Sequence, residues 1–311
     1  MNENKQEKPE ILDKKILIKQ LQDLGIKQGE LLHLKVSLRA IGKIQGGADT
    51  LLDAIIKVVG EEGTIVSDAF INPYHLPLLP ENRVKIPNDK TASYAGAFVN
   101  TMIKHPRMFR SRHPIHKFVA IGAQAKELMH SHTATSGGYE TLQIMADRKA
   151  KNLTIGKKTV GVGTTHVAIN YLGFNKTKID MGINYKDKDG NIKLFIENWN
   201  GGCGRGFPKF IPLYKKHGAI DCDSKIGDAN ALLTDMQKTL QIEIDTLKIK
   251  PTFFFCNDKA CLDCRLSWEH STGSVLITRY YWMLNNLKKR SPKELLKRMK
   301  YYFRLFLSKL H

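Results

Sequence analysis

The sequence lacks a long hydrophobic run, because no stretch of about 18 consecutive apolar residues occurs in its 311 residues. Its first fifteen residues, MNENKQEKPEILDKK, are charged and lack the apolar centre of a secretion signal. We therefore expect a protein that is made and kept in the cytoplasm, long enough to bury a full core in one large domain.

Cysteine is also scarce, with five residues, which in a cytoplasmic chain argues against a disulfide framework. Three of them form a C-x4-C-x2-C cluster, and a fourth thiolate can come from Cys203 or Cys222. Four thiolates suit tetrahedral zinc, the same spacing can hold an iron–sulfur cluster, and unligated thiols are the third alternative. We favour zinc over iron, with the candidate ligands Cys203, Cys256, Cys261 and Cys264.

Acidic residues are few relative to basic ones, since 49 Lys and Arg stand against 30 Asp and Glu, for a formal charge of +19. An excess of this size favours anionic ligands and surfaces over polycationic ones. Residues 288–311 hold nine Lys or Arg and one Glu, so this segment alone carries +8. No recognised nucleic-acid-binding module accompanies the charge, and we expect no nucleic acid partner.

The basic C-terminal segment has the pattern of an amphipathic helix, with apolar residues every three or four positions and lysines on another face. Such a helix can lie on the anionic inner face of a membrane, or pack on the domain or on a partner subunit. Its apolar positions are Leu295, Met299, Tyr302, Phe303, Phe306 and Leu310, and its basic ones are Lys293, Lys297, Lys300 and Arg304.

The elements of the remaining chain, residues 1–287, predict a single α/β domain with a central, largely parallel or mixed sheet flanked by helices. Residues 31–36 and 64–67 form two strands, separated by a Gly-Gly turn and a helix over 48–59. This βαβ unit implies parallel pairing. Further expectations are helices over 11–25, 95–104, 122–129, 142–148 and 232–247, a loop over 72–90, strands at 118–121, 153–155 and 251–255, and a hairpin at 185–192.

One stretch, Leu153–Asn170, combines a short strand, a glycine-rich turn and the start of a helix. His166 stands at the point where the strand gives way to the helix, next to the hydroxyl of Thr165. A neutral histidine in such a place can accept a proton as a general base. The alternative is a structural histidine held by hydrogen bonds.

Several short motifs occur in an order that resembles the aminoglycoside 3-N-acetyltransferase family, which is unrelated in fold to the GNAT acetyltransferases. The resemblance runs from about Leu17 to Phe255, and it implies transfer of an acyl group from acetyl-CoA or another acyl-CoA to an amine. The motifs are VSLRAIG, QGGADTLLDAI, EEGTIV, RSRHP, FVAIG, LTIG, TTHVA and IGDA.

The resemblance also implies roles for individual residues. His166 falls on the family's general base, and Thr165 or N–H groups of the glycine turn could stabilise the oxyanion. A covalent acyl-cysteine route is disfavoured, because no cysteine lies near these motifs in the sequence. The residues that fall at the coenzyme site or border its cleft are Ser37, Leu38, Gly46, Gly47, Arg110, Ser111, His113 and Pro114.

Two departures from the family pattern bear on the acceptor. Family members that act on antibiotics read HSSL where this chain has Lys35–Leu38, and a glutamate where it has Ile169. Loss of that acid in a chain of charge +19 favours an anionic acceptor, such as a nucleotide-linked amino sugar or glycan precursor in polysaccharide biosynthesis. The alternatives are an aminoglycoside acceptor, as in antibiotic resistance, and a metal-bearing binding protein whose acyltransferase site has decayed.

Overall fold

The computed structural model describes residues 11–156, 161–174, 180–198, 203–287 and 291–307. Its main sheet has seven strands in the order β4-β5-β2-β1-β6-β10-β9. The three central strands, β1 (Leu31–Val36), β2 (Thr64–Asp68) and β6 (Lys151–Gly156), are parallel. The flanking strands are antiparallel to their neighbours: β4 (Phe109–Arg110), β5 (Phe118–Gly122), β9 (Ile220–Ile226) and β10 (Ala229–Asp235). The expected mixed sheet in a single α/β domain is confirmed.

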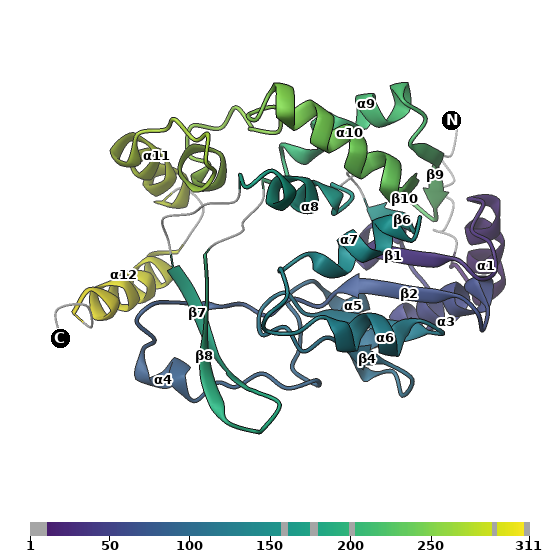
Figure 1. Cartoon of the computed structure of the whole chain (residues 1–311), viewed down its shortest axis with the longest axis horizontal. Helices are drawn as coiled ribbons and strands as arrows, with labels where there is room; N and C mark the ends of the chain where they lie inside the picture. Colours follow the sequence, from purple (N-terminus) through teal and green to yellow (C-terminus); the bar gives the residue numbers. More distant parts are fainter. Residues whose placement is uncertain (1–10, 157–160, 175–179, 199–202, 288–290, 308–311) are drawn as a thin grey trace, which may run out of the picture.

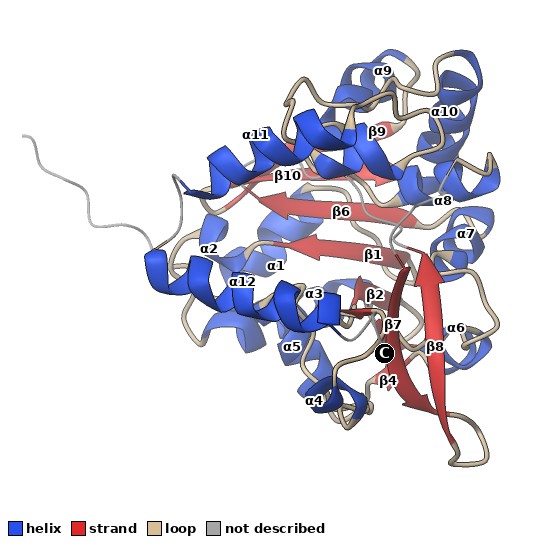
Figure 2. Cartoon of the chain, turned by 90° about the vertical axis from the view of Figure 1, so that its left-hand side faces the viewer, coloured by secondary structure: helices blue, strands red, loops and turns tan. Residues whose placement is uncertain are grey.

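Helices cover both faces of this sheet (Figures 1 and 2). One face packs on α1 (Lys14–Asp23), α3 (Gly47–Val59) and α5 (Ala97–Lys104), whose buried residues share one apolar cluster with the sheet. The other face packs on a second apolar cluster, drawn from α6 (Ala125–Ser131), α7 (Glu140–Asp147), α8 (Thr164–Tyr171), α9 (Ile211–Lys216) and α10 (Met236–Ile249).

Side chains alternate between these two faces along each strand, as a period of two requires. In β1, Leu32 and Leu34 join the cluster on the α1 and α3 side. Leu31 joins the cluster on the α8 side, so His33 points to that face as well. The face beneath α8 therefore receives the polar side chains of the central strands.

A smaller three-stranded sheet lies beside the main one, in the order β3-β7-β8. It consists of β3 (Tyr74–His75), β7 (Asp180–Lys186) and β8 (Ile192–Asn198), and its β7–β8 hairpin extends away from the domain in Figure 1. The predicted hairpin is thus present with longer strands. The short elements that complete the fold are α2 (Leu38–Ile41), α4 (Pro80–Arg83) and the single turns Phe207–Phe210 and Asp263–Ser267.

The chain ends in two helices, α11 (Val275–Leu287) and α12 (Pro292–Leu307), which lie on the side of the molecule facing the viewer in Figure 2. The helix expected in the basic segment is α12. Its Arg304 makes a two-pronged ion pair with Glu81 of α4, at 2.9 and 3.0 Å. Among the described residues, no helix is long and apolar enough to cross a membrane.

Most expected elements are present within a few residues, and the strand–helix–strand unit of β1, α3 and β2 is parallel as predicted. Three expectations need correction. The helix expected over 232–247 begins at Met236, because residues 232–235 belong to β10, where pairing with β6 outweighs the local helical pattern; Asp235 then caps α10 by accepting from Lys238 N at 3.0 Å. Residues 251–255 are turns rather than a strand. The loop over 72–90 contains β3 and α4.

A cluster of buried histidines lies where the RSRHP motif packs on the segment after α6. The rings of His113 and His132 are stacked, with centroids 4.9 Å apart. His113 Nδ1 accepts from His116 N at 2.9 Å, and His132 Nε2 lies 3.0 Å from the carbonyl of Gly137. Burial lowers the pKa of His113 to about 2 and that of His132 to about 4, so both rings are neutral in the folded protein.

These two histidines should make the protein less stable in acid. Below pH ~6.5 the unfolded chain binds protons at both rings while the folded chain does not, so the free energy of unfolding falls as pH drops. Each ring contributes about 1.4 kcal/mol per pH unit between pH ~6 and ~4. Urea unfolding at a series of pH values measures the slope.

The variant His132→Gln keeps a donor for Gly137 but cannot titrate, so it should reduce this slope by about 1.4 kcal/mol per pH unit. The exposed His217 supplies a control, since His217→Ala should leave the slope unchanged. Equal stability of the natural protein at pH 7 and pH 5 would contradict the assignment.

Candidate active site

A cleft of about 490 Å³ opens at the carboxyl ends of the three parallel strands. In open α/β sheets this edge is where ligands bind, because strand ends and the following turns leave side chains and backbone groups free there. The cleft is lined by Leu34, Lys35, Val36, Ser37, Ser67, Asp68, Ala95, Val99, Thr154, Ile155 and Gly156.

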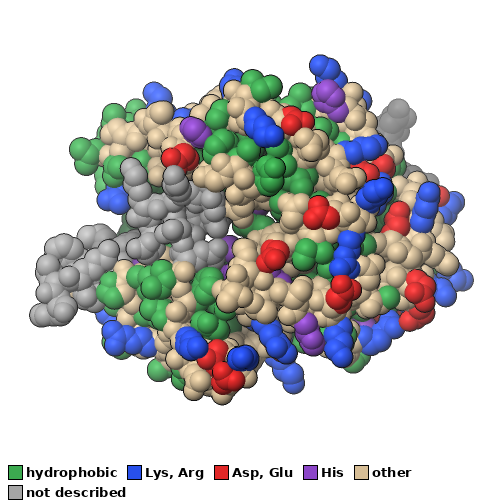
Figure 3. Space-filling model, in the orientation of Figure 1, with side chains coloured by type: hydrophobic (Ala, Val, Ile, Leu, Met, Phe, Trp, Pro, Cys, Tyr) green, Lys and Arg blue, Asp and Glu red, His purple; other side chains and the backbone are tan. Residues whose placement is uncertain are grey.

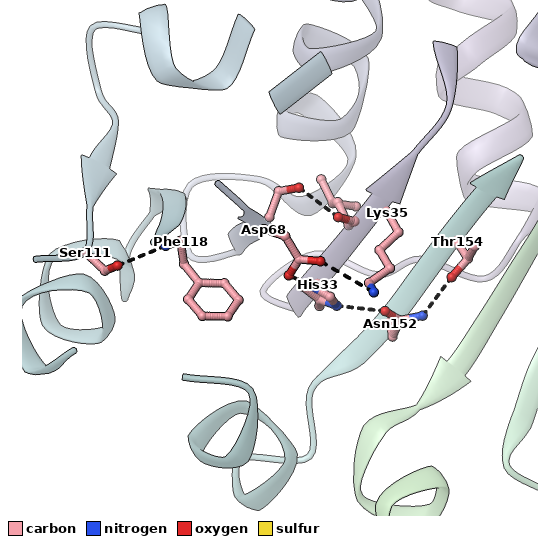
Figure 4. A network of polar contacts seen from close by, with 9 residues as sticks. His33, Lys35, Asp68, Ser111, Phe118, Asn152 and Thr154 are labelled. Atoms are coloured by element: carbon pink, nitrogen blue, oxygen red, sulfur yellow. Dashed lines mark hydrogen bonds and ion pairs between the residues drawn. The ribbon is translucent and has the colours of Figure 1, made fainter. Parts of the chain in front are cut away.

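Polar side chains from all three central strands form one network beside this cleft (Figure 4). His33 Nε2 lies 3.0 Å from a carboxylate oxygen of Asp68, and His33 Nδ1 lies 2.8 Å from Asn152 Oδ1. Asn152 in turn donates to Thr154 Oγ1 at 3.1 Å. Lys35 Nζ lies 3.4 Å from the other oxygen of Asp68. Strand alternation places all five on the α8 side of the sheet.

Asp68 is the negative charge of this network. Burial by itself raises the pKa of its carboxyl group, but Lys35 and His33 lower it more, so the net pKa lies well below the usual range. The carboxylate is therefore ionised across the physiological range. It brings a fixed negative charge to the floor of the cleft, and Lys35 brings a positive one.

His166 stands in the first turn of α8, where the charges of Lys35 and Asp68 act on its ring. The residue before the helix, Gly163, has φ +94°, and a Cβ built on it would lie 3.2 Å from the His33 ring. Glycine is needed there because L side chains rarely adopt this φ and the space is already tight. The ring of His166 stacks on Tyr139, with centroids 4.4 Å apart and planes 4° apart, while Phe207 meets it edge-on at 5.1 Å.

The protonation of His166 follows from these surroundings. Burial lowers its pKa to about 3, Lys35 adds to the effect, and Asp68 opposes it. The ring is therefore neutral near pH 7 and can accept a proton. Asp68 favours the charged ring that such a transfer would create.

The hydroxyl of Thr165 does not face the cleft. It donates to the buried carboxyl group of Glu243 on α10, which also accepts from Tyr214. Thr164 makes a parallel contact to Thr239 at 3.1 Å. This geometry does not fit the expected oxyanion role of Thr165, because its donor is already used to join α8 to α10.

The side chains of the RSRHP motif are also engaged inside the fold. Arg110 donates to the backbone carbonyls of Ala69, Asp89 and Thr91, which ties the loop over 84–96 to β2. Ser111 accepts from Phe118 N at 2.9 Å, and His113 is fully buried. These contacts explain the motif as structural support, and a direct role in coenzyme binding stays a prediction.

Of the coenzyme residues expected at β1 and α3, the structure places those after β1 at the cleft and those at the start of α3 outside its lining. Ser37 follows β1 and lines the cleft, and Leu38 begins α2 immediately after it. Gly46 and Gly47 form the turn at the start of α3, both with positive φ. Within the described residues, neither glycine belongs to the lining of this cleft.

The fold brings four of the five cysteines together and leaves the fifth apart. The sulfurs of Cys203, Cys256, Cys261 and Cys264 all lie within 4.8 Å of one another, and all four residues are buried. Cys222 lies apart, on β9, and pairs with Leu233 of β10. The structure thus selects Cys203 rather than Cys222 as the partner of the C-x4-C-x2-C cluster.

Sequence reasoning missed His33, Asp68 and Asn152 as parts of the site, and it noted Lys35 only as a departure from the family pattern. The available signal was alternation: LLHLK in β1 and NLTI in β6 place polar residues at every second position of otherwise apolar strands. No comparable pattern in the sequence marks Tyr139 or Phe207, because both contact His166 from distant segments.

Comparison with known proteins supports the family resemblance. The family model for aminoglycoside 3-N-acetyltransferase matches residues 32–248. An aminoglycoside N(3)-acetyltransferase IX from Micromonospora chalcea is 33% identical over 125 residues, which cover 36% of this chain and 44% of the relative. A prophage-derived aminoglycoside N(3')-acetyltransferase-like protein, YokD, from Bacillus subtilis is 31% identical over 140 residues, 40% of this chain and 52% of the relative. The matches thus span about half of these relatives.

Solved structures share the fold over most of the chain. AAC-VIa with bound sisomicin has a TM-score of 0.68 at 21% identity, covering 78% of this chain and 99% of the other. AAC-IIIb with CoASH has a TM-score of 0.69 at 19% identity, covering 78% and 98%. At such identities the likeness concerns the fold alone. Because the family model covers more than half of its residues, the chain belongs to the aminoglycoside 3-N-acetyltransferase family.

Proposed function

We propose that this protein transfers an acetyl or other short acyl group from acyl-CoA to the amine of an amino sugar. The observation that carries the proposal is the neutral His166 ring, held against Tyr139 and subject to the charge of Asp68, which lines the cleft. A protein that only bound a ligand would not need a proton acceptor poised in this way.

The reaction needs one proton acceptor and one stabiliser of positive charge. The amine nitrogen attacks the thioester carbonyl carbon and forms the new C–N bond, and its proton passes to a ring nitrogen of His166. The tetrahedral intermediate then breaks the C–S bond, and the same proton leaves with the sulfur as coenzyme A thiol. Atoms and charge balance without a metal ion or a covalent enzyme intermediate.

Asp68 lowers the cost of the first step. A ring of pKa about 3 is a weak base, but its charged form gains from the nearby carboxylate as the proton arrives. His33 at 3.0 Å and Lys35 at 3.4 Å keep that carboxylate ionised and oriented toward the cleft. In this proposal Asp68 and His33 are positioning residues for His166.

The acyl donor fits the cleft at the strand ends. Coenzyme A is polyanionic, and Lys35 and the backbone around Ser37 offer a cation and polar groups along the lining. The overall charge of +19 acts in the same direction. Lys and Arg side chains are spread along the lower and right-hand edges of the face shown in Figure 3. A coenzyme A complex of a structural neighbour, AAC-IIIb, supports this donor.

The acceptor favoured by the comparisons is an aminoglycoside. The relatives are named aminoglycoside N(3)-acetyltransferases, and a neighbour binds sisomicin. No comparison supports the anionic acceptor that the sequence suggested. We therefore place the amine of an aminoglycoside-type amino sugar first.

A nucleotide-linked amino sugar is kept as a second candidate because of one observation, the cation in the cleft. Lys35 lines it beside Asp68, which offsets its charge, and the ammonium group of Lys35 can bind a diphosphate oxygen directly. Ile169, which replaces the family's acid, is fully buried in the cluster beneath α8 and supplies no compensating charge. Precursors for polysaccharide biosynthesis belong to this class.

The role of His166 is tested by substitution. The variant His166→Ala should fold normally and lower kcat by roughly two to four orders of magnitude, since the proton acceptor is lost. Release of coenzyme A thiol measures turnover, and circular dichroism checks folding. The exposed His217 gives a matched control, because His217→Ala removes a histidine at the end of α9 that belongs neither to the cleft lining nor to the Asp68 network.

Near-normal turnover of His166→Ala would show that another group accepts the proton. Absence of thiol release with every acceptor, together with absence of coenzyme A binding by calorimetry, would favour a binding protein with a decayed site.

The choice of acceptor is tested with a panel of aminoglycosides and nucleotide-linked amino sugars in the same assay. If Lys35 discriminates by charge, Lys35→Gln should raise kcat/KM for aminoglycosides by roughly tenfold, which corresponds to about 1.4 kcal/mol. The same change should lower kcat/KM for nucleotide sugars. Equal effects on both classes would show that Lys35 does not select the acceptor.

We propose a cytoplasmic location with peripheral membrane contact through the C-terminal helices. Leu276 of α11 is 82% exposed, and Leu296 and Phe303 of α12 are 54% and 62% exposed beside basic side chains. Apolar and basic groups together suit an anionic lipid surface. Packing against a partner subunit is the competing explanation for the same exposed groups.

Binding to vesicles separates these two explanations. The full chain should sediment with vesicles of phosphatidylcholine and phosphatidylglycerol but not with phosphatidylcholine alone, and added salt should weaken binding. Lys297→Glu with Lys300→Glu should abolish it. Lys57→Glu with Lys104→Glu makes the same charge change on α3 and α5 and should have a smaller effect. Dimerisation without sedimentation would contradict membrane contact.

A further inference from the structure

The four clustered cysteines come from two segments that lie far apart in the sequence. Cys203 precedes the turn Phe207–Phe210, and the other three lie in the segment 256–264 that follows α10. Their sulfurs converge within 4.8 Å, and each residue is at most 6% exposed. The proposed acyl transfer uses none of them, and the comparisons do not assign them a role.

We propose that Cys203, Cys256, Cys261 and Cys264 bind one structural zinc ion. Four thiolates at Zn–S distances of about 2.3 Å in a tetrahedron have neighbouring sulfurs about 3.8 Å apart. The Cys203 and Cys261 sulfurs are 3.7 Å apart. The spacing therefore suits a single ion at the centre of the four.

This spacing also decides between the two kinds of metal centre that the sequence left open. In an iron–sulfur cluster the four thiolates are divided among two or four iron atoms, so sulfurs on different irons lie farther apart than those around a single ion. All four sulfurs here fall within 4.8 Å. Among mononuclear ions, zinc is the usual occupant of a tetrahedral four-thiolate site.

The surroundings of the sulfurs suit the negative charge of such a centre. Four thiolates around Zn²⁺ carry a net charge of −2, which nearby N–H donors and cations stabilise. Cys256 N donates to Cys264 Sγ at 3.3 Å. Arg265 binds the carbonyl of Cys256 at 2.6 Å, and Arg205 forms an ion pair with Asp258 at 2.5 Å. Both arginines thereby tie the segment 256–264 in place around the sulfurs.

The site has the character of a structural centre rather than a catalytic one. Four protein ligands fill the tetrahedron, and their burial leaves no place for water or substrate. Three closely spaced cysteines after α10 and one before the turn at 207–210 would be joined by the ion. Zinc would thus close a chain loop of about sixty residues, which restricts the unfolded state.

The metal site also connects to the proposed base. The backbone carbonyl of Cys203 accepts from Gly206 N at 2.7 Å, and the next residue, Phe207, packs edge-on against His166. A Cβ on Gly206 would lie 1.7 Å from the carbonyl of Phe254, so only glycine allows this contact. Phe207 in turn packs on Phe254 at 5.7 Å. The zinc site therefore fixes the position of Phe207, whose ring contacts His166, and of Phe254 behind it.

The first test is the metal content of the full chain purified under reducing conditions without added metal. Elemental analysis should find about one zinc per chain. Replacement by cobalt should give the visible d–d bands and the sulfur-to-metal charge-transfer band of a four-thiolate tetrahedral site. Neither measurement depends on acyltransferase activity, so this inference and the proposed function can fail separately.

Substitution provides the second test. Cys261→Ser should lower the zinc content to background and lower Tm by at least about 5 °C, because metal binding is coupled to folding. Cys222→Ser is the matched control, since Cys222 lies on β9 outside the cluster, and it should keep zinc and Tm. If Cys261→Ser does not fold, metal content and the cobalt spectrum of the natural chain still decide the question.

Three outcomes would overturn the proposal. One is protein without bound metal whose four buried thiols react freely with a thiol reagent. Another is a brown protein that contains iron and acid-labile sulfide, which would mean a cluster. The third is a mass deficit of two or four hydrogens in the chain purified under reducing conditions, which would mean disulfides.

Discussion

The hydrogen bond between His33 and Asp68 is the interaction on which the site depends. It joins two neighbouring parallel strands below the cleft, and it is extended by Asn152 on the third strand and by Lys35 at the rim. A buried carboxylate without such partners would take up a proton and lose its charge. With them, the strand ends present a fixed negative charge to whatever occupies the space beneath α8.

The position of His166 depends on backbone geometry and on aromatic packing together. Gly163 lets the chain turn tightly over the His33 ring, and Tyr139 then supports the imidazole by stacking. The same packing removes water from the ring and keeps it neutral. The residue before it, Thr165, ties α8 to α10 through Glu243, so the helix that carries the base is held on two sides.

Packed side chains connect the cysteine cluster to the proposed base. Cys203 lies four residues before Phe207, whose ring contacts His166. A displacement of the cluster would therefore shift Phe207 and, through this packing, the ring of His166. In the same way, Arg304 on α12 and Glu81 on α4 join the C-terminal helices to the loop that follows β3.

The sequence by itself determined the α/β class, the parallel unit of β1, α3 and β2, the place of His166 and the cysteine cluster. Each rests on local periodicity or short spacing, which a chain displays without knowledge of its fold. Tertiary structure decided the rest: the convergence of His33, Asp68 and Asn152, the burial of Thr165 against Glu243, and the choice of Cys203 over Cys222. These depend on which distant segments pack together, and the local pattern shows which face of a strand a side chain takes but not which strand lies beside it.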